Sequence, residues 1–230
     1  MFADHLLSLP SMHGAIDADD CVQVAASLEA AAVRRDPVLL LAPDGVAPRV
    51  IAHRAAMLLG PLPEQHRRWL KIEHDIYTRA LGAEGPLDRP LRAPHYTISR
   101  AGMAGDWHDV HPIGCHSIKT PRCVCNGELH RVQRIGETRM ARFGVLYLDR
   151  LHEWPTPPLA SIPPVCADMG DTRPWVIASA FLCPCGMRGM RKRATFCRCT
   201  PEQILAHGQR VRRNALLLGA ITEIVVGDAS

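Results

Sequence analysis

The sequence predicts an α/β fold whose strands are buried in a mostly parallel sheet. Residues 38–41, Val-Leu-Leu-Leu, form a short and wholly apolar run, which is typical of a strand covered on both faces. Segments with helical periodicity flank this run, at residues 20–35 and from Pro48 onward. A strand, a turn and a helix in that order indicate an α/β sheet. Two more buried strands are predicted at residues 144–149 and 175–180, and a last strand at residues 221–226.

The first two helices have recognisable starts. Asp19 or Asp20 can cap the N-terminus of the helix predicted over residues 20–35. Residues 43–45, Pro-Asp-Gly, turn the chain after the first strand. Pro48 then opens the second helix, at a position where its missing N–H removes no helical hydrogen bond.

The second half of the chain contains one clear helix start and two irregular stretches. Thr200, Pro201 and Gln203 have the spacing of an N-cap, an N1 proline and an N3 glutamine, so a helix with a capping box is predicted there. Residues 156–164 contain four prolines and are predicted to form a loop rather than a helix. Residues 105–132 are rich in His, Cys and Gly without a clean period, which indicates an exposed insertion.

Length and composition indicate one domain, residues 1–230, with a core of its own. Asp4 and His5 precede a short apolar run that Pro10 interrupts, so neither a signal peptide nor a membrane-spanning helix is expected. The sequence therefore predicts a cytoplasmic protein without a membrane partner. In that compartment the nine cysteines are expected to be metal ligands or buried thiols rather than disulfides.

Positive charge is concentrated near the C-terminal end. Residues 187–213 hold eight arginines and lysines against one glutamate, a local charge of +7, so the rest of the chain must carry −3 to reach the total of +4. Such a segment suits a nucleic-acid backbone, and it suits a solvated arginine-rich face equally well, because no aromatic residues alternate with the charges. The candidate nucleic-acid-binding residues are Arg188, Arg191, Lys192, Arg193, Arg210, Arg212 and Arg213.

Four cysteines within residues 183–199 give the most specific chemical pattern. Cys183 and Cys185 form one close pair, and Cys197 and Cys199 form a second after eleven intervening residues. Two such pairs can place four thiolates around one Zn²⁺, so the sequence predicts a structural zinc knuckle. The alternatives are reduced thiols in a surface loop or two disulfides, because the spacing is C-x-C rather than the commoner C-x-x-C.

A second metal site is a weaker hypothesis for the insertion at residues 105–132. Thiols and imidazoles are ordinary zinc ligands, but a loop that is merely rich in histidine accounts for the composition at least as well. The candidate ligands are His108, His111, Cys115, His116, Cys123, Cys125 and His130.

Several motifs occur in an order that resembles one known family. Residues 89–97 read Arg-Pro-Leu-Arg-Ala-Pro-His-Tyr-Thr, residues 135–137 read Ile-Gly-Glu, and residues 144–149 read Gly-Val-Leu-Tyr-Leu-Asp. With the Cys-Pro-Cys-Gly and Cys-x-Cys-x-Pro-x-Gln pattern of residues 181–204 and the helix leading into residues 38–41, they resemble the competence-associated ComM branch of the magnesium-chelatase-like AAA+ ATPases. The resemblance implies a three-layer AAA+ core of the P-loop NTPase type, joined to a Cys-rich knuckle loop.

The chain departs from that family at the phosphate-binding loop. The family's Gly-Pro-Pro-Gly-Thr-Gly-Lys-Thr cradles phosphates, with the lysine on the β/γ oxygens and the threonine on Mg²⁺. Residues 42–49 read Ala-Pro-Asp-Gly-Val-Ala-Pro-Arg, so Pro48 and Arg49 replace the lysine and the threonine. Tight binding of ATP and Mg²⁺ is therefore not expected. If a nucleotide does bind, the candidate residues are Gly45, Arg49 and Asp149.

Other catalytic parts of the family are replaced as well. The Asp-Glu that ends its Walker B strand reads Asp149-Arg150, and a guanidinium cannot act as a general base. Residues 180–182 lack the water-positioning asparagine, and residues 217–221 lack the arginine finger. Residues 151–174 form too short an interval for the family's pore-facing insertion, and no helical lid is expected after residue 226.

These departures predict a non-catalytic relative of the ComM-like ATPases that works by binding. Its expected partners are nucleic acid or an active AAA+ ring, contacted through a basic surface that zinc organises. The rival interpretation is a divergent ATPase that binds ATP through the candidate nucleotide residues and acts in DNA processing. A third is a remnant held together by zinc, without a selected activity.

Overall fold

The computed structural model describes residues 2, 6, 18–44, 46–78, 89–110, 130–163, 172–189, 196–219 and 221–226. Its helices are α2 (Ala18–Arg34), α3 (Pro48–Ala55), α4 (Glu64–Thr78), α5 (Arg100–Ala104), α6 (Glu137–Met140), α7 (Thr156–Leu159) and α8 (Pro201–Leu216), with 3₁₀ turns η2 (Ala56–Leu59) and η3 (Leu151–Glu153). Its strands are β1 (Val38–Leu41), β2 (Leu91–Arg92), β3 (Gly105–Val110), β4 (His130–Ile135), β5 (Val145–Leu148), β6 (Trp175–Ala180) and β7 (Thr222–Val225).

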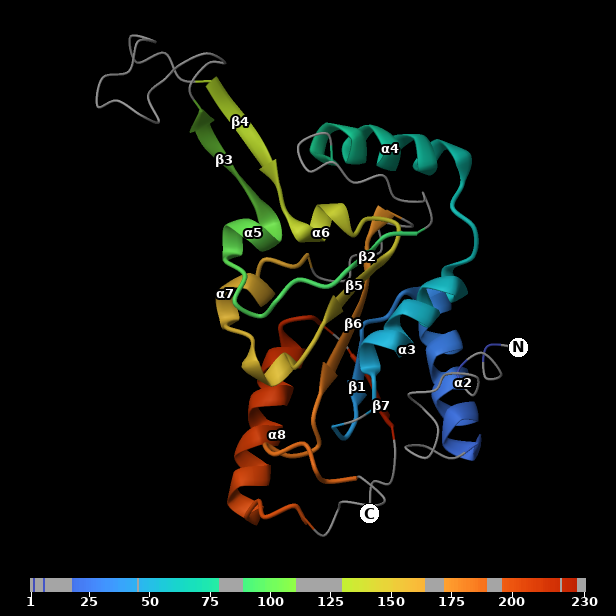
Figure 1. Ribbon diagram of the computed structural model, residues 1–230, viewed down its shortest axis with the longest axis vertical. Helices are drawn as coiled ribbons and strands as arrows, with labels where there is room; N and C mark the ends of the chain where they lie inside the picture. Colours follow the sequence, from blue (N-terminus) through green and yellow to red (C-terminus); the bar gives the residue numbers. More distant parts are fainter. Residues whose placement is uncertain are drawn as a thin grey trace.

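A five-stranded sheet in the order β2-β5-β6-β1-β7 forms the centre of the molecule (Figure 1). Each pair of neighbouring strands in it is parallel. The residues of β5 and β6 are buried throughout, as expected of parallel strands covered on both faces. The predicted α/β fold with a mostly parallel sheet is confirmed, and it is consistent with a P-loop-like core.

Alternate residues of the strands face two separate cores, one on each side of the sheet. Val38 and Leu40 of β1 belong to the core that includes buried residues of α2 and α3. Leu39 lies in the other core, with Val211 and Ala215 of α8. Helices therefore cover both faces, and the sheet is the middle of three layers (Figure 1).

The helix after the knuckle begins as the sequence predicts. The Thr200 side chain accepts a hydrogen bond from the Gln203 N–H, and the Gln203 side chain accepts one from the Thr200 N–H. Pro201 lies in the first turn, so the predicted capping box is confirmed.

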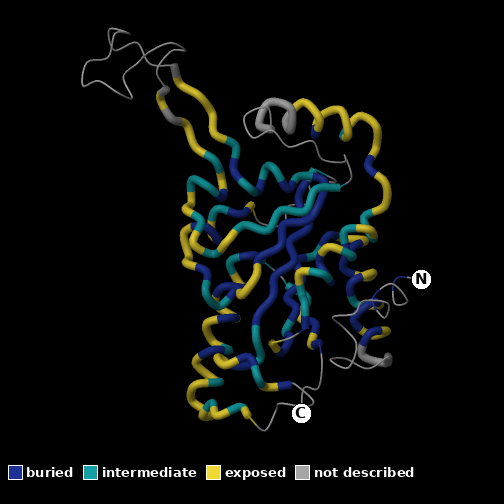
Figure 2. Tube along the Cα trace, viewed as in Figure 1, coloured by how far each residue is buried: buried dark blue, intermediate teal, exposed yellow. Residues whose placement is uncertain are grey.

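Three segments differ from the sequence-based expectation. The prediction of a loop over residues 156–164 is wrong at its start, where prolines in the first turn allow the single-turn helix α7. The ends of the predicted insertion at 105–132 form the antiparallel ribbon β3–β4, which projects from the body of the molecule (Figure 1). The long helix α4 was not predicted, because its exposed Trp69 and Ile72 blur the helical period. Figure 2 shows the described parts of the ribbon and of α4 to be largely exposed.

None of the helices in the described ranges combines the length and the apolar composition needed to cross a membrane.

Candidate metal centre and the adjoining sheet edge

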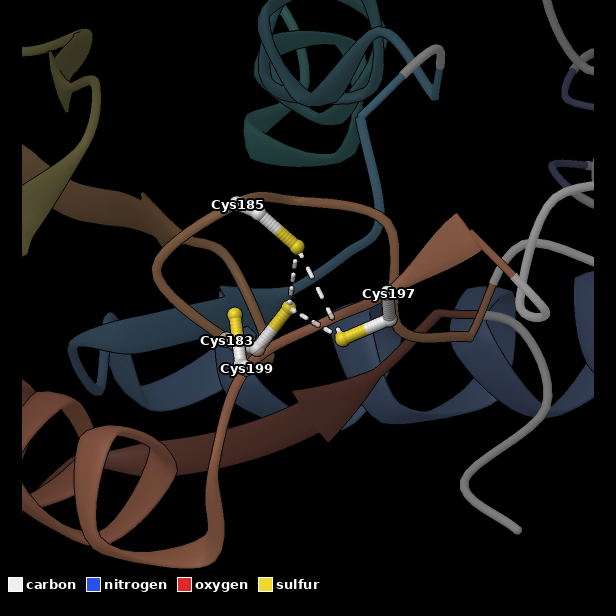
Figure 3. A group of neighbouring side chains, drawn as sticks. All are labelled: Cys183, Cys185, Cys197 and Cys199. Carbon is white, nitrogen blue, oxygen red and sulfur yellow. Dashed lines mark hydrogen bonds between the residues drawn. The ribbon is translucent and has the colours of Figure 1, made fainter.

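The four cysteines of the predicted knuckle converge on one point. Their Sγ atoms all lie within 4.8 Å of one another, and Figure 3 shows those of Cys183, Cys185 and Cys197 turned toward one another. Cys183 Sγ lies 3.4 Å from Cys185 Sγ and 3.7 Å from Cys197 Sγ, and the last two are 3.6 Å apart. The chain reaches this point twice: directly after β6, and again just before α8.

These separations match the geometry of a tetrahedral zinc site. Four sulfur atoms at Zn–S bonds of about 2.3 Å form a tetrahedron with edges of about 3.8 Å. Three of the six edges, at 3.4, 3.6 and 3.7 Å, are within a few tenths of an ångström of that value, and the three that involve Cys199 are at most 4.8 Å. Disulfide bonds of about 2.0 Å would require a different arrangement, and the structure has all four cysteines as free thiols. The cluster can therefore hold a metal ion, and its all-sulfur ligand set fits Zn²⁺.

Backbone N–H groups surround the sulfur atoms. The Arg188 N–H donates to Cys183 Sγ at 3.4 Å. A bond from the Cys199 N–H lowers the pKa of the Cys197 thiol, whereas burial raises the pKa values of Cys183 and Cys185. Amides of this kind stabilise thiolates, which are the form that binds a metal, so proton release would accompany binding.

The knuckle packs directly on the loop that joins β1 to α3. The Asp44 N–H donates to the Gly186 carbonyl at 2.8 Å. Gly186 has φ +75°, and a Cβ at this position would lie 3.0 Å from Asp44 Cβ. A side chain at this position would strain the backbone and crowd Asp44, so glycine is the residue that fits without cost. The cysteine loop and the β1–α3 loop are therefore in direct backbone contact.

Two hydroxyl groups donate hydrogen bonds to the Asp149 carboxylate, directly after β5. Asp149 Oδ1 accepts hydrogen bonds from Ser179 Oγ at 2.8 Å and from Tyr147 Oη at 3.0 Å. Burial, and after it the Asp149 charge, raises the pKa of Tyr147, so the phenol stays protonated and can donate. The Asp149 carboxylate therefore accepts hydrogen bonds from two neutral hydroxyls.

Arg150 has an unusual backbone conformation next to this carboxylate. Its φ of 50° and ψ of 57° lie in the left-handed region, which costs a non-glycine residue about 1–2 kcal/mol. Its N–H donates to Ser179 Oγ at 3.3 Å, and its guanidinium lies over the Phe181 ring at 5.9 Å. The surroundings therefore hold Arg150 in a strained turn at the carboxyl edge of the sheet.

Two cavities adjoin at this edge and share Asp149 and Arg150. The smaller, of about 130 Å³, lies along the β1–α3 loop and is also lined by Asp44 and Pro48. The larger, of about 270 Å³, is also lined by Arg49. Ligands in α/β proteins bind outside the carboxyl ends of the strands, so both cavities lie where a binding site is expected.

The structure describes two of the three candidate nucleotide residues, Arg49 and Asp149. Arg49, in the first turn of α3, is exposed, and together with Asp149 it lines the larger cavity. Gly45 lies outside the described residues.

Of the candidate nucleic-acid-binding residues, Arg188, Arg210, Arg212 and Arg213 are exposed. Arg191, Lys192 and Arg193 lie outside the described residues. His108 and His130 are placed on β3 and β4, where His130 pairs with Val110 and His108 with Val132. The other five candidate ligands of the second metal site fall outside the described ranges, so that hypothesis stays a prediction.

Sequence reasoning missed the partners of Asp149 and a histidine pair in which His207 is buried and His152 is half-buried. Ser179 is one polar residue in the apolar strand β6, and only that interruption could have indicated a role. The rings of His152 and His207 lie 4.5 Å apart, and His207 Nε2 lies 2.8 Å from the Phe181 carbonyl. Burial, and after it the His207 charge, lowers the pKa of His152 to about 4.

Comparison with known proteins supports part of the resemblance. Residues 17–120 match the family model described as magnesium chelatase, subunit ChlI, which supports a relation to the magnesium-chelatase-like AAA+ family. The match runs from the start of α2 into the β3–β4 insertion and does not include the knuckle. No curated protein sequence matches the chain. Among solved structures, the crystal structure of NtrX from Brucella abortus is similar over 89% of this chain and 36% of that chain, with 15% identity and a TM-score of 0.42. This chain thus spans about a third of the length of that protein.

Proposed function

We propose that this protein is a non-hydrolysing relative of the magnesium-chelatase-like AAA+ proteins, of the ComM branch, and that it acts by binding nucleic acid. The observation that carries the proposal is the state of the β1–α3 loop. Pro48 and Arg49 stand where a phosphate-binding lysine and a magnesium-binding hydroxyl are needed, and the Asp44 N–H is already bonded to the Gly186 carbonyl. A loop built this way lacks the charge and part of the free N–H donors that cradle phosphates.

The remaining parts of an ATPase site are also unsuited to hydrolysis. Phosphoryl transfer depends on a bound metal ion and on a group that orients the attacking water. Asp149 is turned toward Ser179 and Tyr147, and its neighbour in the chain, Arg150, is a permanent cation. Asp44 lines the smaller cavity and would repel an anionic ligand there.

The cysteine cluster supports a structural rather than a catalytic metal. A site with four protein ligands leaves no coordination position for water or substrate. Cys183 follows β6 and Cys199 precedes α8, so a bound Zn²⁺ would fix the start of α8 relative to the sheet. The metal thus organises the surface that α8 presents.

That surface is basic. Arg198, Arg210, Arg212 and Arg213 are exposed, and within the described part of the chain none of their side chains pairs with a carboxylate. Guanidinium groups that are not neutralised by acids bind phosphate oxygens and release the counterions of a nucleic acid. Nucleic acid is therefore favoured over an active AAA+ ring as the partner, because a phosphate backbone is recognised by charge alone.

The test is the salt dependence of binding to a fluorescent duplex, measured by anisotropy with zinc-loaded protein. We expect log K to fall linearly with log salt, and the slope to become shallower by about 0.9 for each phosphate-binding side chain that a variant removes. The test variant replaces Arg210, Arg212 and Arg213 of α8 by Gln. The matched control replaces Arg34, Arg54 and Arg68, which lie on α2, α3 and α4 away from α8 (Figure 1), and changes the net charge equally.

Three results would overturn parts of this proposal. Equal weakening of binding in both triple variants would mean that the attraction is not located on α8. Absence of binding at low salt would exclude nucleic acid as the partner and would favour an AAA+ ring instead. Phosphate release from ATP in the presence of Mg²⁺ would eliminate the non-hydrolysing role and favour the divergent ATPase.

A further inference from the structure

A cavity of about 420 Å³ lies at the opposite edge of the sheet from the candidate nucleotide residues. Leu91, one of its lining residues, starts β2 and pairs with Val145, the first residue of the parallel strand β5. The cavity is therefore at the amino edge of the sheet. It is also lined by the start of α4, which lies at the other end of the molecule from α8 (Figure 1). Its volume is within the usual range for ligand pockets, and it shares no described lining residue with the two cavities at the carboxyl edge.

One wall of this cavity is held in place by Arg89. The Arg89 guanidinium donates hydrogen bonds to the carbonyls of Leu59, Gly60 and Pro61, at 2.7, 2.7 and 3.3 Å. It also donates to the Phe143 carbonyl, shortly before β5. Charged donors hold carbonyl groups more strongly than neutral donors do. The segment between η2 and α4 is therefore fixed against the sheet, so the cavity does not depend on a ligand for its shape.

Arg67, near the start of α4, brings an available positive charge to the cavity. Its closest partners are the Leu62 carbonyl at 3.4 Å and Glu64 Oε2 at 3.7 Å, and both distances are long for a hydrogen bond. Most of the five guanidinium donors thus remain available. The exposed His53, near the end of α3, also lines the cavity, and its ring has no hydrogen-bond partner within the described part of the chain.

Much of the remaining lining is apolar. It comes from Ala56, Met57, Pro61, Leu62 and Leu91. Met57 is 54% exposed, and its flexible thioether side chain can adapt to the shape of a ligand. None of the described lining residues is acidic, so this set contains no carboxylate that would repel an anion.

We propose that this cavity binds a small carboxylic acid with an apolar body, which places its carboxylate on Arg67 and its apolar part against Met57 and Leu62. A guanidinium matches a carboxylate with two parallel hydrogen bonds. A single negative charge is favoured over a phosphate, because Arg89 already uses its donors on backbone carbonyls and Arg67 supplies the available charge. The apolar walls stabilise the rest of such a ligand by burying it from water. The site is distant from α8 and from the β1–α3 loop, so its occupancy does not depend on the proposed function.

The experiment is an NMR titration of isotope-labelled, zinc-loaded protein with 2-naphthoate as the probe. The backbone amide of Gly60 reports on the cavity, and the amide of Gly186 in the cysteine knuckle is the reference for binding elsewhere. Naphthamide is titrated as the neutral analogue of naphthoate. Acetate is titrated as a carboxylate without an apolar body.

Two variants test the two parts of the site. Arg67→Gln removes the charge, and Arg68→Gln is its control, because Arg68 is the next residue of the same helix and is not among the described lining residues. Met57→Asp places a negative charge on the apolar wall, and Ile72→Asp, at another exposed apolar residue outside the described lining, is its control. All four side chains are exposed, so the variants should fold, and thermal unfolding checks this.

We expect the Gly60 signal to shift with a Kd of about 0.1–1 mM for a probe of this size, while the Gly186 signal stays in place. Arg67→Gln and Met57→Asp should each weaken the binding of naphthoate about tenfold or more, and the two controls should bind it like the unaltered protein. Naphthamide should bind the unaltered protein about tenfold more weakly than naphthoate, and Arg67→Gln should not weaken it further. Acetate should leave the Gly60 signal in place.

The proposal is overturned if the Gly60 signal shows no saturable shift, or if Arg67→Gln binds naphthoate like the unaltered protein. Equal binding of naphthoate and naphthamide would refute the assignment of a carboxylate, because the cavity would then select apolar molecules without regard to charge. Equal losses in the variants and their controls would refute the location of the site.

Discussion

Replacing Gly186 by alanine tests the contact between the cysteine knuckle and the β1–α3 loop. Gly186 adopts φ +75°, and its carbonyl accepts the Asp44 N–H at 2.8 Å. The new methyl group would lie 3.0 Å from Asp44 Cβ, closer than the 3.5–4.0 Å of an ordinary carbon contact. The substitution therefore strains the backbone and pushes the knuckle away from the loop.

The expected cost can be worked out from these two effects. The left-handed conformation costs alanine about 1–2 kcal/mol more than glycine, and the crowded contact adds about 1 kcal/mol. A total of about 2–3 kcal/mol lowers the melting temperature by about 4–12 °C for a protein of this size. Because the cysteine loop must shift, we also expect zinc to bind more weakly.

Thermal unfolding of zinc-loaded protein measures this effect, with Gly208→Ala as the control. Gly208 lies within α8, and nothing lies within 4 Å of the position of its Cβ, so alanine should stabilise that helix by about 0.5–1 kcal/mol. The two glycine-to-alanine changes should thus have opposite signs. An unchanged or raised melting temperature for Gly186→Ala would refute the inferred contact.

Two further predictions concern the metal and the pair of histidines, His152 and His207. Cys183→Ser removes a buried ligand and should abolish stoichiometric zinc binding, measured by release of zinc to a chromogenic chelator. Cys21→Ala, which changes a cysteine outside the cluster, should leave zinc binding unchanged. Zinc retained by Cys183→Ser would contradict the four-thiolate site. The pKa of His152 is lowered from 6.5 to about 4, so the unfolded chain binds a proton in this interval and the folded chain does not. The stability that neutral His152 contributes is therefore complete above pH 6.5 and lost as the pH falls toward 4, by about 1–2 kcal/mol once solvent screening of the partly exposed ring is allowed for. His152→Leu should flatten this part of the pH dependence of the unfolding free energy. His95→Gln changes an exposed histidine and should leave the pH dependence as it is. An unchanged slope in His152→Leu would contradict the lowered pKa of His152.

The parts of the fold that the sequence predicted are those set by local pattern. Residues 38–41 and 175–180 are wholly apolar apart from Ser179. Such a run is sufficient to predict a strand that is buried on both faces of a sheet. The capping box at Thr200 depends on residues three positions apart, so its spacing alone identifies the start of α8. The cysteine cluster was predicted for a similar reason, because two close pairs of cysteines separated by a short loop can be recognised from their spacing alone.

The parts that were missed depend on contacts between distant residues. The hydrogen bond between Asp44 and Gly186 spans most of the chain, and neither residue indicates it locally. The role of Ser179 appears only when β6 lies beside β5 and its hydroxyl meets Asp149. The β3–β4 ribbon escaped prediction because exposed polar residues leave it without an apolar alternation.

We propose that the β1–α3 loop does not support magnesium-dependent ATP chemistry. A calorimetric titration of zinc-loaded protein with ATP, in the presence and absence of Mg²⁺, is the decisive measurement. We expect that Mg²⁺ gives no gain in affinity and that no phosphate is released. Micromolar binding that appears only with Mg²⁺ and is followed by phosphate release would show instead that the loop supports this chemistry.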